Sequence, residues 1–329
     1  MTRMRLVIVV LAALLALPAS AQAGVIALEG TQLVYRADPG VADKLIFSDG
    51  DDALLVNPLG APLRVGAGCN DSRLGVQCPL AGVAGLTVFA ADGDDDVQAF
   101  TPLPLTLDLG DGDDHFDASG TAVMVLGGAG KDQGVVSADS AAISGGDGND
   151  GFEVEGSDRS SGPYALDGGP GDDVISLQRR GPGMTLIGGD GNDKLYATAT
   201  GKAAVTFDCG AGADRWVAYP RDIPGDGCAA HLAGITTKTV SRAFREGALT
   251  GPASGSVTLK RRKGLSGYEG PTVARGVFTA QPGPLRVSLK RTAAGTRLLR
   301  RAPHLTVFVS IRTRTGDDRG ETTFRSKVG

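Results

Sequence analysis

Six copies of the motif Gly-x-Gly-x-Asp supply the residue types that bind a hard cation. They are GDGDD (110–114), GAGKD (128–132), GDGND (146–150), GPGDD (169–173), GDGND (189–193) and GAGAD (210–214). Two looser copies precede them, SDGDD (48–52) and ADGDD (91–95). Glycine adopts the positive φ of a tight turn and leaves room for backbone carbonyl oxygens to converge. Carbonyl oxygens together with an aspartate at the end of the turn are ligands that Ca²⁺ prefers.

The closing aspartates recur with a nearly constant period. From Asp114 to Asp214 the steps are 18, 18, 23, 20 and 21 residues, which indicates one structural unit stacked on itself. Four positions around each aspartate are apolar in almost every copy, nine and seven before it and two and four after it. Around Asp150 they are Ala141, Ile143, Phe152 and Val154. Within each pair the spacing is two, which is typical of a strand with one buried face.

We therefore predict an all-β chain, a parallel β-roll or β-solenoid followed by a small antiparallel β-sandwich-like domain. Each coil would contain two short strands, a glycine turn at one edge and a plainer turn at the other. Gly134 leaves a gap in the apolar columns. The coil that ends at Asp52 fits only partly, because Asp43 occupies one of its apolar positions.

Stacking places the turn aspartates about 4.8 Å apart, so their charges repel unless something neutralises them. Calcium suits such oxygen-rich turns, whereas zinc does not, because no His or Cys cluster lies near them. An Asp/Gly turn ladder without metal is the alternative interpretation.

The chain here resembles the repeat-in-toxin (RTX) family, whose hemolysin-type nonapeptide is Gly-Gly-x-Gly-x-Asp-x-U-x with U large and apolar. Full matches are GGDGNDGFE (145–153), GGPGDDVIS (168–176) and GGDGNDKLY (188–196), and the resemblance covers roughly residues 90–218. The resemblance implies calcium ions between adjacent turns, held by aspartates and turn carbonyls. The implied ligands are Asp95, Asp114, Asp132, Asp150, Asp173, Asp193 and Asp214, with Gly112, Gly130, Gly148, Gly171, Gly191 and Gly212. Because the opposite edge carries few ligand residues, we expect several ions in a single column.

The N-terminus predicts export. Arg3 and Arg5, the apolar run from 6 to 17, and an A-x-A cleavage site at 21–23 form a secretory signal peptide. Four cysteines in an exported chain suggest two disulfides. Three pairings are open, and proximity in the sequence favours Cys69–Cys78 and Cys209–Cys228. We expect a secreted or cell-envelope protein with no stable membrane span.

The charge distribution divides the chain. Residues 24–228 carry 12 Lys+Arg and 32 Asp+Glu, whereas residues 229–329 carry 19 and 5. The expected segments are a signal peptide (1–23), an N-terminal β region and cap with Cys69–Cys78 (24–88), the calcium-binding roll with its cap Cys209–Cys228 (89–228) and a basic β-sandwich-like domain (229–329). The glycine motif is absent after about residue 235, and a short helix is expected over 295–301.

The basic domain offers a second function, attachment to an anionic cell-wall or extracellular polysaccharide. A solvated, solubilising surface is the plainer interpretation, and nucleic acid is not expected because stacking aromatics are sparse. We identify no catalytic constellation and expect a protein that is not an enzyme. The least favoured function is a Ca²⁺-dependent polysaccharide lyase or epimerase that uses Asp114, His115 and Asp117 with Arg159, Arg179 or Arg180.

Overall fold

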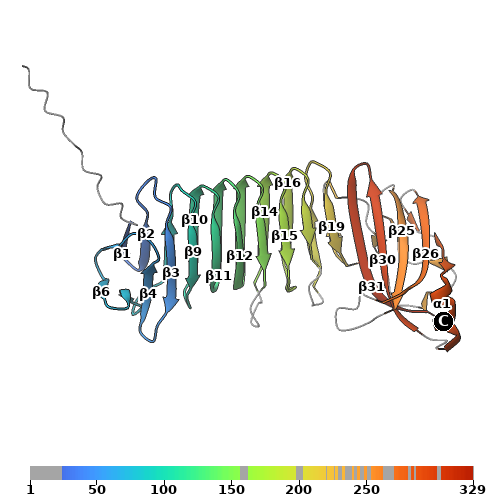
Figure 1. Ribbon diagram of the computed structural model, residues 1–329, viewed down its shortest axis with the longest axis horizontal. Helices are drawn as coiled ribbons and strands as arrows, with labels where there is room; N and C mark the ends of the chain where they lie inside the picture. The colour runs from blue at the N-terminus through green and yellow to red at the C-terminus, as the bar shows by residue number, and fades with distance from the viewer. Residues whose placement is uncertain are drawn as a thin grey trace, which may run out of the picture.

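The computed structural model describes most of the chain after residue 23. The described residues are 24–155, 162–197, 203–219, 221–225, 227–228, 232–233, 239–240, 243–244, 248–249, 253–261, 270–280, 283–284, 287–301 and 305–328. The predicted signal peptide therefore lies outside them, as does Arg159 of the catalytic hypothesis. Nearly all described elements are strands, as predicted, and the molecule is elongated (Figure 1).

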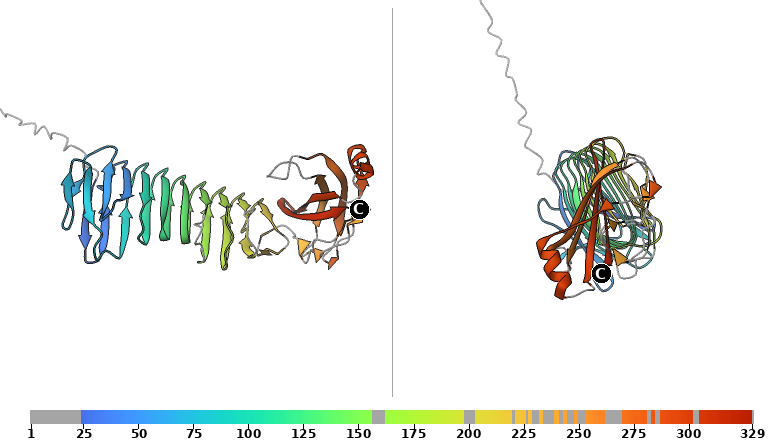
Figure 2. Two further views of the ribbon diagram at one scale, coloured as in Figure 1. Left: turned by 90° about the horizontal axis from the view of Figure 1, so that it is seen from below. Right: turned by 90° about the vertical axis from the view of Figure 1, so that its right-hand side faces the viewer.

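The central body is a parallel β-solenoid in which two sheets face each other across a thin core (Figures 1 and 2). Its strands are β8 (Gly85–Phe89), β9 (Asp96–Phe100), β10 (Leu105–Asp111), β11 (His115–Ala129), β12 (Gln133–Asp147), β13 (Gly151–Val154), β14 (Tyr164–Pro170), β15 (Val174–Leu177), β16 (Met184–Asp190), β17 (Lys194–Tyr196), β18 (Val205–Asp208), β19 (Arg215–Ala218) and β20 (Ile223–Pro224). One sheet contains β8, β10, β14, β16, β18 and β20, and the other contains β9, β13, β15, β17 and β19. The long strands β11 and β12 bend around the plain edge and contribute to both sheets.

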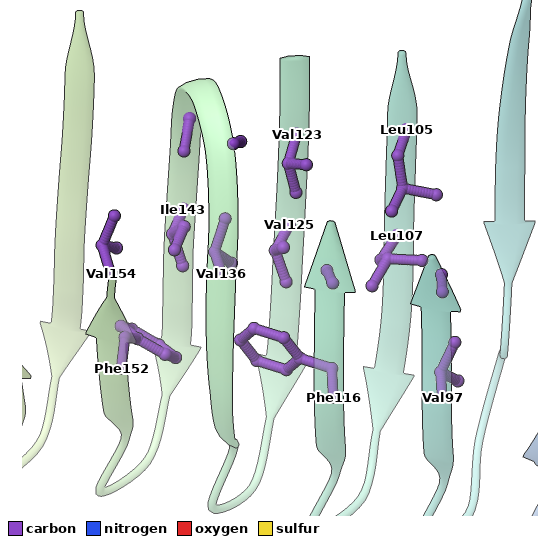
Figure 3. Packing of buried hydrophobic residues seen from close by; sticks show 14 of the residues in the cluster. Val97, Leu105, Leu107, Phe116, Val123, Val125, Val136, Ile143, Phe152 and Val154 are labelled. Carbon is purple, nitrogen blue, oxygen red and sulfur yellow. The ribbon is translucent and has the colours of Figure 1, made fainter. Parts of the chain in front are cut away.

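The predicted apolar columns form the core. The register places Leu107, Val125, Ile143 and Leu166 opposite one another in successive strands, and each is buried. Figure 3 shows Leu107, Val125 and Ile143 stacked between the sheets. Each fully buried side chain of this size contributes roughly 1.5–3 kcal/mol, so stability accumulates coil by coil.

Aromatic side chains fill the gap that Gly134 leaves. A Cβ on Gly134 would lie 2.4 Å from a ring carbon of Phe116, which occupies the space. Phe116 and Phe152, from the coils on either side, bring their ring centroids to 6.0 Å (Figure 3). The missing side chain is therefore compensated by its two neighbours in the same column.

The N-terminal strands close one end of the stack. They are β1 (Val25–Glu29), β2 (Gln32–Arg36), β3 (Lys44–Asp49), β4 (Ala53–Pro58), β5 (Arg64–Val65), β6 (Asn70–Ser72) and β7 (Gly75–Pro79). Strands β2 and β3 run parallel to β8 and β9 and form a first coil. Antiparallel partners β1 and β4 then cover its sheet edges, and β7 pairs with β4. The disulfide Cys69–Cys78 forms as predicted and links this layer.

The prediction of a coil that ends at Asp52 was wrong. Strand β4 turns back antiparallel to β3, so Asp52 lies exposed in the hairpin between them. The buried carboxylate of the first coil is Asp43, one rung before Asp95. The glycine motif at 48–52 is therefore a hairpin turn, and the turn before β3 lacks the motif.

The last complete coil is held by two cross-links. Cys209–Cys228 forms the second predicted disulfide. At the plain edge, Arg180 and Asp222 form a fully buried ion pair, with Asp222 Oδ1 2.5 Å from one guanidinium nitrogen and Oδ2 2.8 Å from the other. Both fasten the segment after β19 to the stack.

The C-terminal part is an antiparallel sheet with one helix. Its elements are β21 (Leu232–Ala233), β22 (Thr239–Val240), β23 (Ala243–Phe244), β24 (Ala248–Leu249), β25 (Ala253–Arg261), β26 (Thr272–Ala280), β27 (Gly283–Pro284), β28 (Val287–Ser288), β29 (Lys290–Arg291), α1 (Ala293–Arg301), β30 (Leu305–Thr315) and β31 (Asp318–Val328). The strand order is β26-β25-β30-β31, and α1 confirms the expected helix. Among the described residues, no helix is long and apolar enough to cross a membrane.

Strand β31 joins this sheet directly to the solenoid. It pairs in parallel with β19, with Arg215 opposite Arg319 and Trp216 opposite Gly320 (Figure 1). Gly316 and Asp317 form the turn before β31 and Asp318 is its first residue, and together they repeat the last three residues of a GDGDD turn. One short copy of the pattern therefore recurs after residue 235. The strand that begins at its last residue, β31, covers the sheet edge that β19 would otherwise leave unpaired.

Candidate metal centre

The glycine turns are packed too closely to accept side chains. Gly146 and Gly148 have φ values of +104° and +146°, where residues with a Cβ are strained. A Cβ on Gly148 would lie 1.5 Å from the carbonyl oxygen of Gly130 in the preceding coil. Among the described residues, Ala91 is the one non-glycine with positive φ, and it stands where the later turns have glycine. The motif therefore fixes both the turn and the rise between coils.

Each closing aspartate points into the coil and is buried. Its Oδ1 atom accepts a hydrogen bond from the backbone N–H of the equivalent aspartate one coil earlier, at 2.8 Å from Asp132 N to Asp150 Oδ1. The same bond joins Asp95 to Asp114, Asp114 to Asp132, Asp150 to Asp173, Asp173 to Asp193 and Asp193 to Asp214. One oxygen of each carboxylate thus ties neighbouring turns together.

The second oxygen has no hydrogen-bond partner among the described residues. The buried atoms without a partner include Oδ2 of Asp95, Asp114, Asp132, Asp150, Asp173, Asp193 and Asp214. A buried carboxylate oxygen left unpaired is costly, and native structures rarely keep one without a function. Here seven stand in register, which marks the column as the candidate site.

Backbone carbonyls converge on the same oxygens. A Cβ on Gly145 would lie 2.2 Å from Asp150 Oδ2 and 2.4 Å from the carbonyl oxygen of Gly168. The first glycine of each GGxGxD copy has no side chain, and the space this leaves is shared by two oxygen atoms. They are Oδ2 of the aspartate in the same turn and the carbonyl oxygen of the first residue in the next coil's turn. The carbonyls placed in this way are those of Gly145, Gly168, Gly188 and Cys209. The sequence pattern did not single them out, because only stacking brings a first-position carbonyl to the preceding carboxylate.

The fourth-position glycines implied by the resemblance lie at the rim of the turns. Gly112, Gly130, Gly148, Gly171 and Gly191 are half-buried, and Gly212 is exposed. From Gly93 to Gly191, the carbonyl of each such glycine points at the equivalent glycine of the next coil. They form a second column of oxygens beside the carboxylates.

Burial raises the pKa of the seven closing aspartates from Asp95 to Asp214, since a low-dielectric surrounding penalises the charged form. The pKa of Asp95 rises to about 8, and those of Asp132 and Asp173 rise to about 7. Burial raises the pKa of Asp193 to about 6 and also raises those of Asp114, Asp150 and Asp214. Neighbouring carboxylates add to the effect, as Asp114 does for Asp95. Near neutral pH the column therefore needs protons or a cation.

The fifth turn position forms an exposed ladder outside this column. Oδ1 of Asp113 accepts from Lys131 N at 2.8 Å, and Oδ1 of Asp172 accepts from Asn192 N at 2.7 Å. Lys131, the basic residue in this ladder, points to solvent. It does not enter the column of buried carboxylates.

The carboxylate column extends one rung beyond the motif at each end. Asp43 N donates to Asp95 Oδ1 at 2.5 Å, and Tyr35 donates to Asp43 Oδ2 at 2.5 Å. At the other end, Asp214 N donates to Asp318 Oδ1 at 3.3 Å. Sequence reasoning missed both residues, although the Gly-Asp-Asp triplet at 316–318 was a usable signal.

The donors fit a hard cation. Among the described residues, no three His, Cys, Asp or Glu side chains are grouped so that they could hold a metal by themselves. An ion between rungs would therefore need backbone carbonyl oxygens as ligands in addition to the carboxylate oxygens. Flexible, oxygen-only coordination suits Ca²⁺, whereas zinc favours His and Cys ligands.

In the least favoured, catalytic hypothesis, Asp114 and Arg180 lie apart from His115. Asp114 is buried in the column, whereas His115 points outward between Asp96 and Gln133 of the adjacent strands. Arg180 is committed to Asp222 at the plain edge, three coils away, which is about 14 Å along the stack.

Searches of protein-family models, curated proteins and solved structures found no match to this chain.

Proposed function

We propose that this chain is an exported, non-enzymatic calcium-binding β-roll protein. Ca²⁺ ions held in a single column between stacked GGxGxD turns would organise the roll. The observation that carries the proposal is the register of seven buried carboxylate oxygens without a partner, four of which share their space with a backbone carbonyl. The resemblance of the turns to RTX repeats supports the same ion.

Asp132, Asp150, Asp173 and Asp193 would hold the ions together with the carbonyls of Gly145, Gly168, Gly188 and Cys209. Asp95, Asp114 and Asp214 would extend the column toward its ends. A bound cation supplies the positive charge that lets buried carboxylates remain ionised on successive rungs. Its binding free energy then becomes folding free energy, because the unfolded chain does not assemble the column.

The expected size of the effect follows from extracellular conditions. Extracellular calcium modules bind with dissociation constants of about 10⁻⁴–10⁻³ M, so 1 mM Ca²⁺ adds up to about 1.4 kcal/mol for each site. Several sites in one stack add several kcal/mol. The predicted signal peptide and the two disulfides support a secreted or envelope location, where calcium is abundant.

Metal analysis and calorimetry on the purified full chain test the proposal. We expect several Ca²⁺ per chain, a melting temperature that falls after chelation, and recovery with Ca²⁺ but much less with Mg²⁺. Magnesium is the matched control because it carries the same charge but requires a smaller, more rigid octahedral site. An unchanged melting temperature after chelation, with no calcium in the metal analysis, would exclude the proposal.

A further inference from the structure

A basic cleft lies where the last coil meets the C-terminal sheet. Its volume is about 440 Å³, and strands β19, β25, β30 and β31 line it. Its charged residues include Arg215, Arg312, Arg314 and Arg319, and Ser254 and Ser256 contribute hydroxyl groups. Because these residues come from both sides of the junction, the cleft exists only when β31 is docked on β19.

The register sets four basic side chains in one row across four strands. Arg314 stands opposite Arg319, Arg319 opposite Arg215, and Arg215 opposite Lys194. All four are exposed, whereas the next residues inward, Thr313, Gly320 and Trp216, are buried. Adjacent strands are about 4.8 Å apart, so the row is about 14 Å long.

Acidic neighbours neutralise only part of this row. Arg314 pairs with Asp317 at 3.1 Å, and in the cleft Arg312 pairs with Glu321 at 3.1 Å. The pKa of Asp172 is lowered first by hydrogen bonds from Asn192 and then by Lys194, so Lys194 also has an acidic neighbour.

Arg215 and Arg319 lie side by side at the centre of the row. Within the described part of the chain, neither guanidinium has an acidic partner. Like charges directly opposite each other on adjacent strands are destabilising unless a ligand neutralises them. Guanidinium groups bind carboxylate and sulfate oxygens through two parallel hydrogen bonds.

We propose that this cleft binds an acidic polysaccharide. Successive carboxylate or sulfate groups lie along Arg314, Arg319 and Arg215 in the cleft and continue to Lys194 beside it, and Ser254 and Ser256 face sugar hydroxyls. A row about 14 Å long calls for a ligand with repeated anions rather than a single small ion. The concave shape and the absence of large exposed apolar residues from its lining favour a polymer chain over a membrane surface.

The test is calorimetric titration of the full chain, in 1 mM Ca²⁺ and low salt, with a sulfated dextran oligosaccharide. Neutral dextran of the same length and sodium sulfate are the comparison ligands. We expect binding of the sulfated oligosaccharide that weakens with added salt, much weaker binding of free sulfate, and none of neutral dextran. The double substitution Arg215→Gln and Arg319→Gln should weaken binding at least about tenfold, because it removes two charge-assisted contacts.

The matched control removes the same charge elsewhere in the same sheet. Arg275 and Lys290 are exposed, lie opposite each other on β26 and β29, and do not line the cleft. Arg275→Gln with Lys290→Gln should change affinity less than about twofold, whereas Arg319→Lys should keep part of it. Circular dichroism on each variant separates lost binding from lost folding.

Three results would overturn the proposal. They are equal weakening by the two double substitutions, equal affinity for sulfated and neutral dextran, or binding to anionic phospholipid vesicles without binding to the sulfated oligosaccharide. None of these depends on the calcium column, so the failure of one proposal is distinguishable from the failure of the other.

Discussion

The two edges of the coils differ in how they satisfy their polar groups. At the glycine edge, the coils that end at Asp95 to Asp214 repeat one turn, and each turn leaves Oδ2 of its aspartate without a partner among the described residues. At the plain edge, the buried carboxylate of Asp222 finds its partners within the chain, although Nε of Arg180 has no hydrogen-bond partner among the described residues. Asp222 takes both guanidinium nitrogens of Arg180 as well as the backbone N–H groups of Val205 and Tyr219. The hydroxyl of Tyr164 donates to Ala138 O at 2.6 Å.

The plain edge therefore satisfies the carboxylate of Asp222 within the chain, whereas the glycine edge leaves carboxylate oxygens for a ligand. The plain edge absorbs the uneven spacing between copies, because the positions from nine before to four after each aspartate keep their register. Its groups can therefore be paired individually. The glycine edge is strictly periodic, so a carboxylate oxygen that lacks a partner in one turn lacks it in every turn. A ligand that pairs with these oxygens must therefore repeat from coil to coil.

The largest expected effect of this contrast is a loss of stability with rising pH in metal-free protein, which calcium abolishes. The pKa values of the column carboxyls are raised above their unfolded value of about 3.9, to about 8 for Asp95 and about 7 for Asp132 and Asp173. Folding without metal therefore takes up protons. The stability of metal-free protein is highest near pH 4 and falls as the pH rises through 6 to 8.

Thermal melts of protein stripped of metal and dialysed to pH values between 4 and 8 measure this trend. With 1 mM Ca²⁺ the loss between pH 6 and 8 should disappear, because the cation replaces the protons. A metal-free melting temperature that stays level or rises over this range would contradict the assignment of the buried column as the dominant acidic feature.

The next effect tests how tightly the glycine edge is stacked. Gly148→Ala sets a methyl group 1.5 Å from the carbonyl oxygen of Gly130, at a φ of +146°, and neither backbone can withdraw without breaking the stack. We expect a loss of more than about 4 kcal/mol in the free energy of unfolding, measured by denaturant titration in calcium.

Gly82→Ala is the matched control. Gly82 also has a positive φ, +80°, but a Cβ there would meet nothing within 4 Å. Its cost should be only the left-handed backbone penalty, about 1–2 kcal/mol. Similar losses for the two substitutions would show that backbone strain, and not stacking, makes the turn glycines necessary.

The interior of the stack and the two disulfides at its ends could be predicted from sequence, whereas the outermost aspartates of the column and the junction with the C-terminal sheet could not. The apolar columns around Asp150 are strictly periodic, so their burial followed from spacing alone. The spacing did not identify Asp43 and Asp318 as members of the column, because a single rung at an end has no repeat on its outer side. The first coil lacks the GxG turn altogether, and Asp318 follows Asp214 by 104 residues.

The basic cleft was hidden for the same reason. The sequence showed an excess of positive charge after residue 229, but not which arginines meet. Arg215 belongs to the acidic part of the chain, and it joins Arg319 only through the pairing of β19 with β31. Long-range strand pairing of this kind leaves no local pattern, whereas the coil period does.

The smallest effect is that of Asp150→Asn, and the isosteric substitution Asp222→Asn at the plain edge is its comparison, with an expected effect of opposite sign in metal-free protein at pH 7.5. At Asp150 the amide oxygen keeps the bond from Asp132 N, and the amide NH₂ can donate to Gly168 O in place of the unpaired Oδ2. The buried charge disappears, so stability should rise by about 1 kcal/mol while the response to calcium shrinks.

At Asp222, by contrast, the amide NH₂ faces donors, and the charge of Arg180 loses its partner, so we expect a loss of about 3–5 kcal/mol with or without calcium. Denaturant titrations of the two variants, each with chelator and with 1 mM Ca²⁺, measure both signs. The chelator result decides between the two explanations of the column. A metal-free Asp150→Asn protein that is less stable than the parent would mean that the carboxylate is already satisfied without a cation. The carboxylates of the glycine edge would then be satisfied within the chain, as Asp222 is at the plain edge.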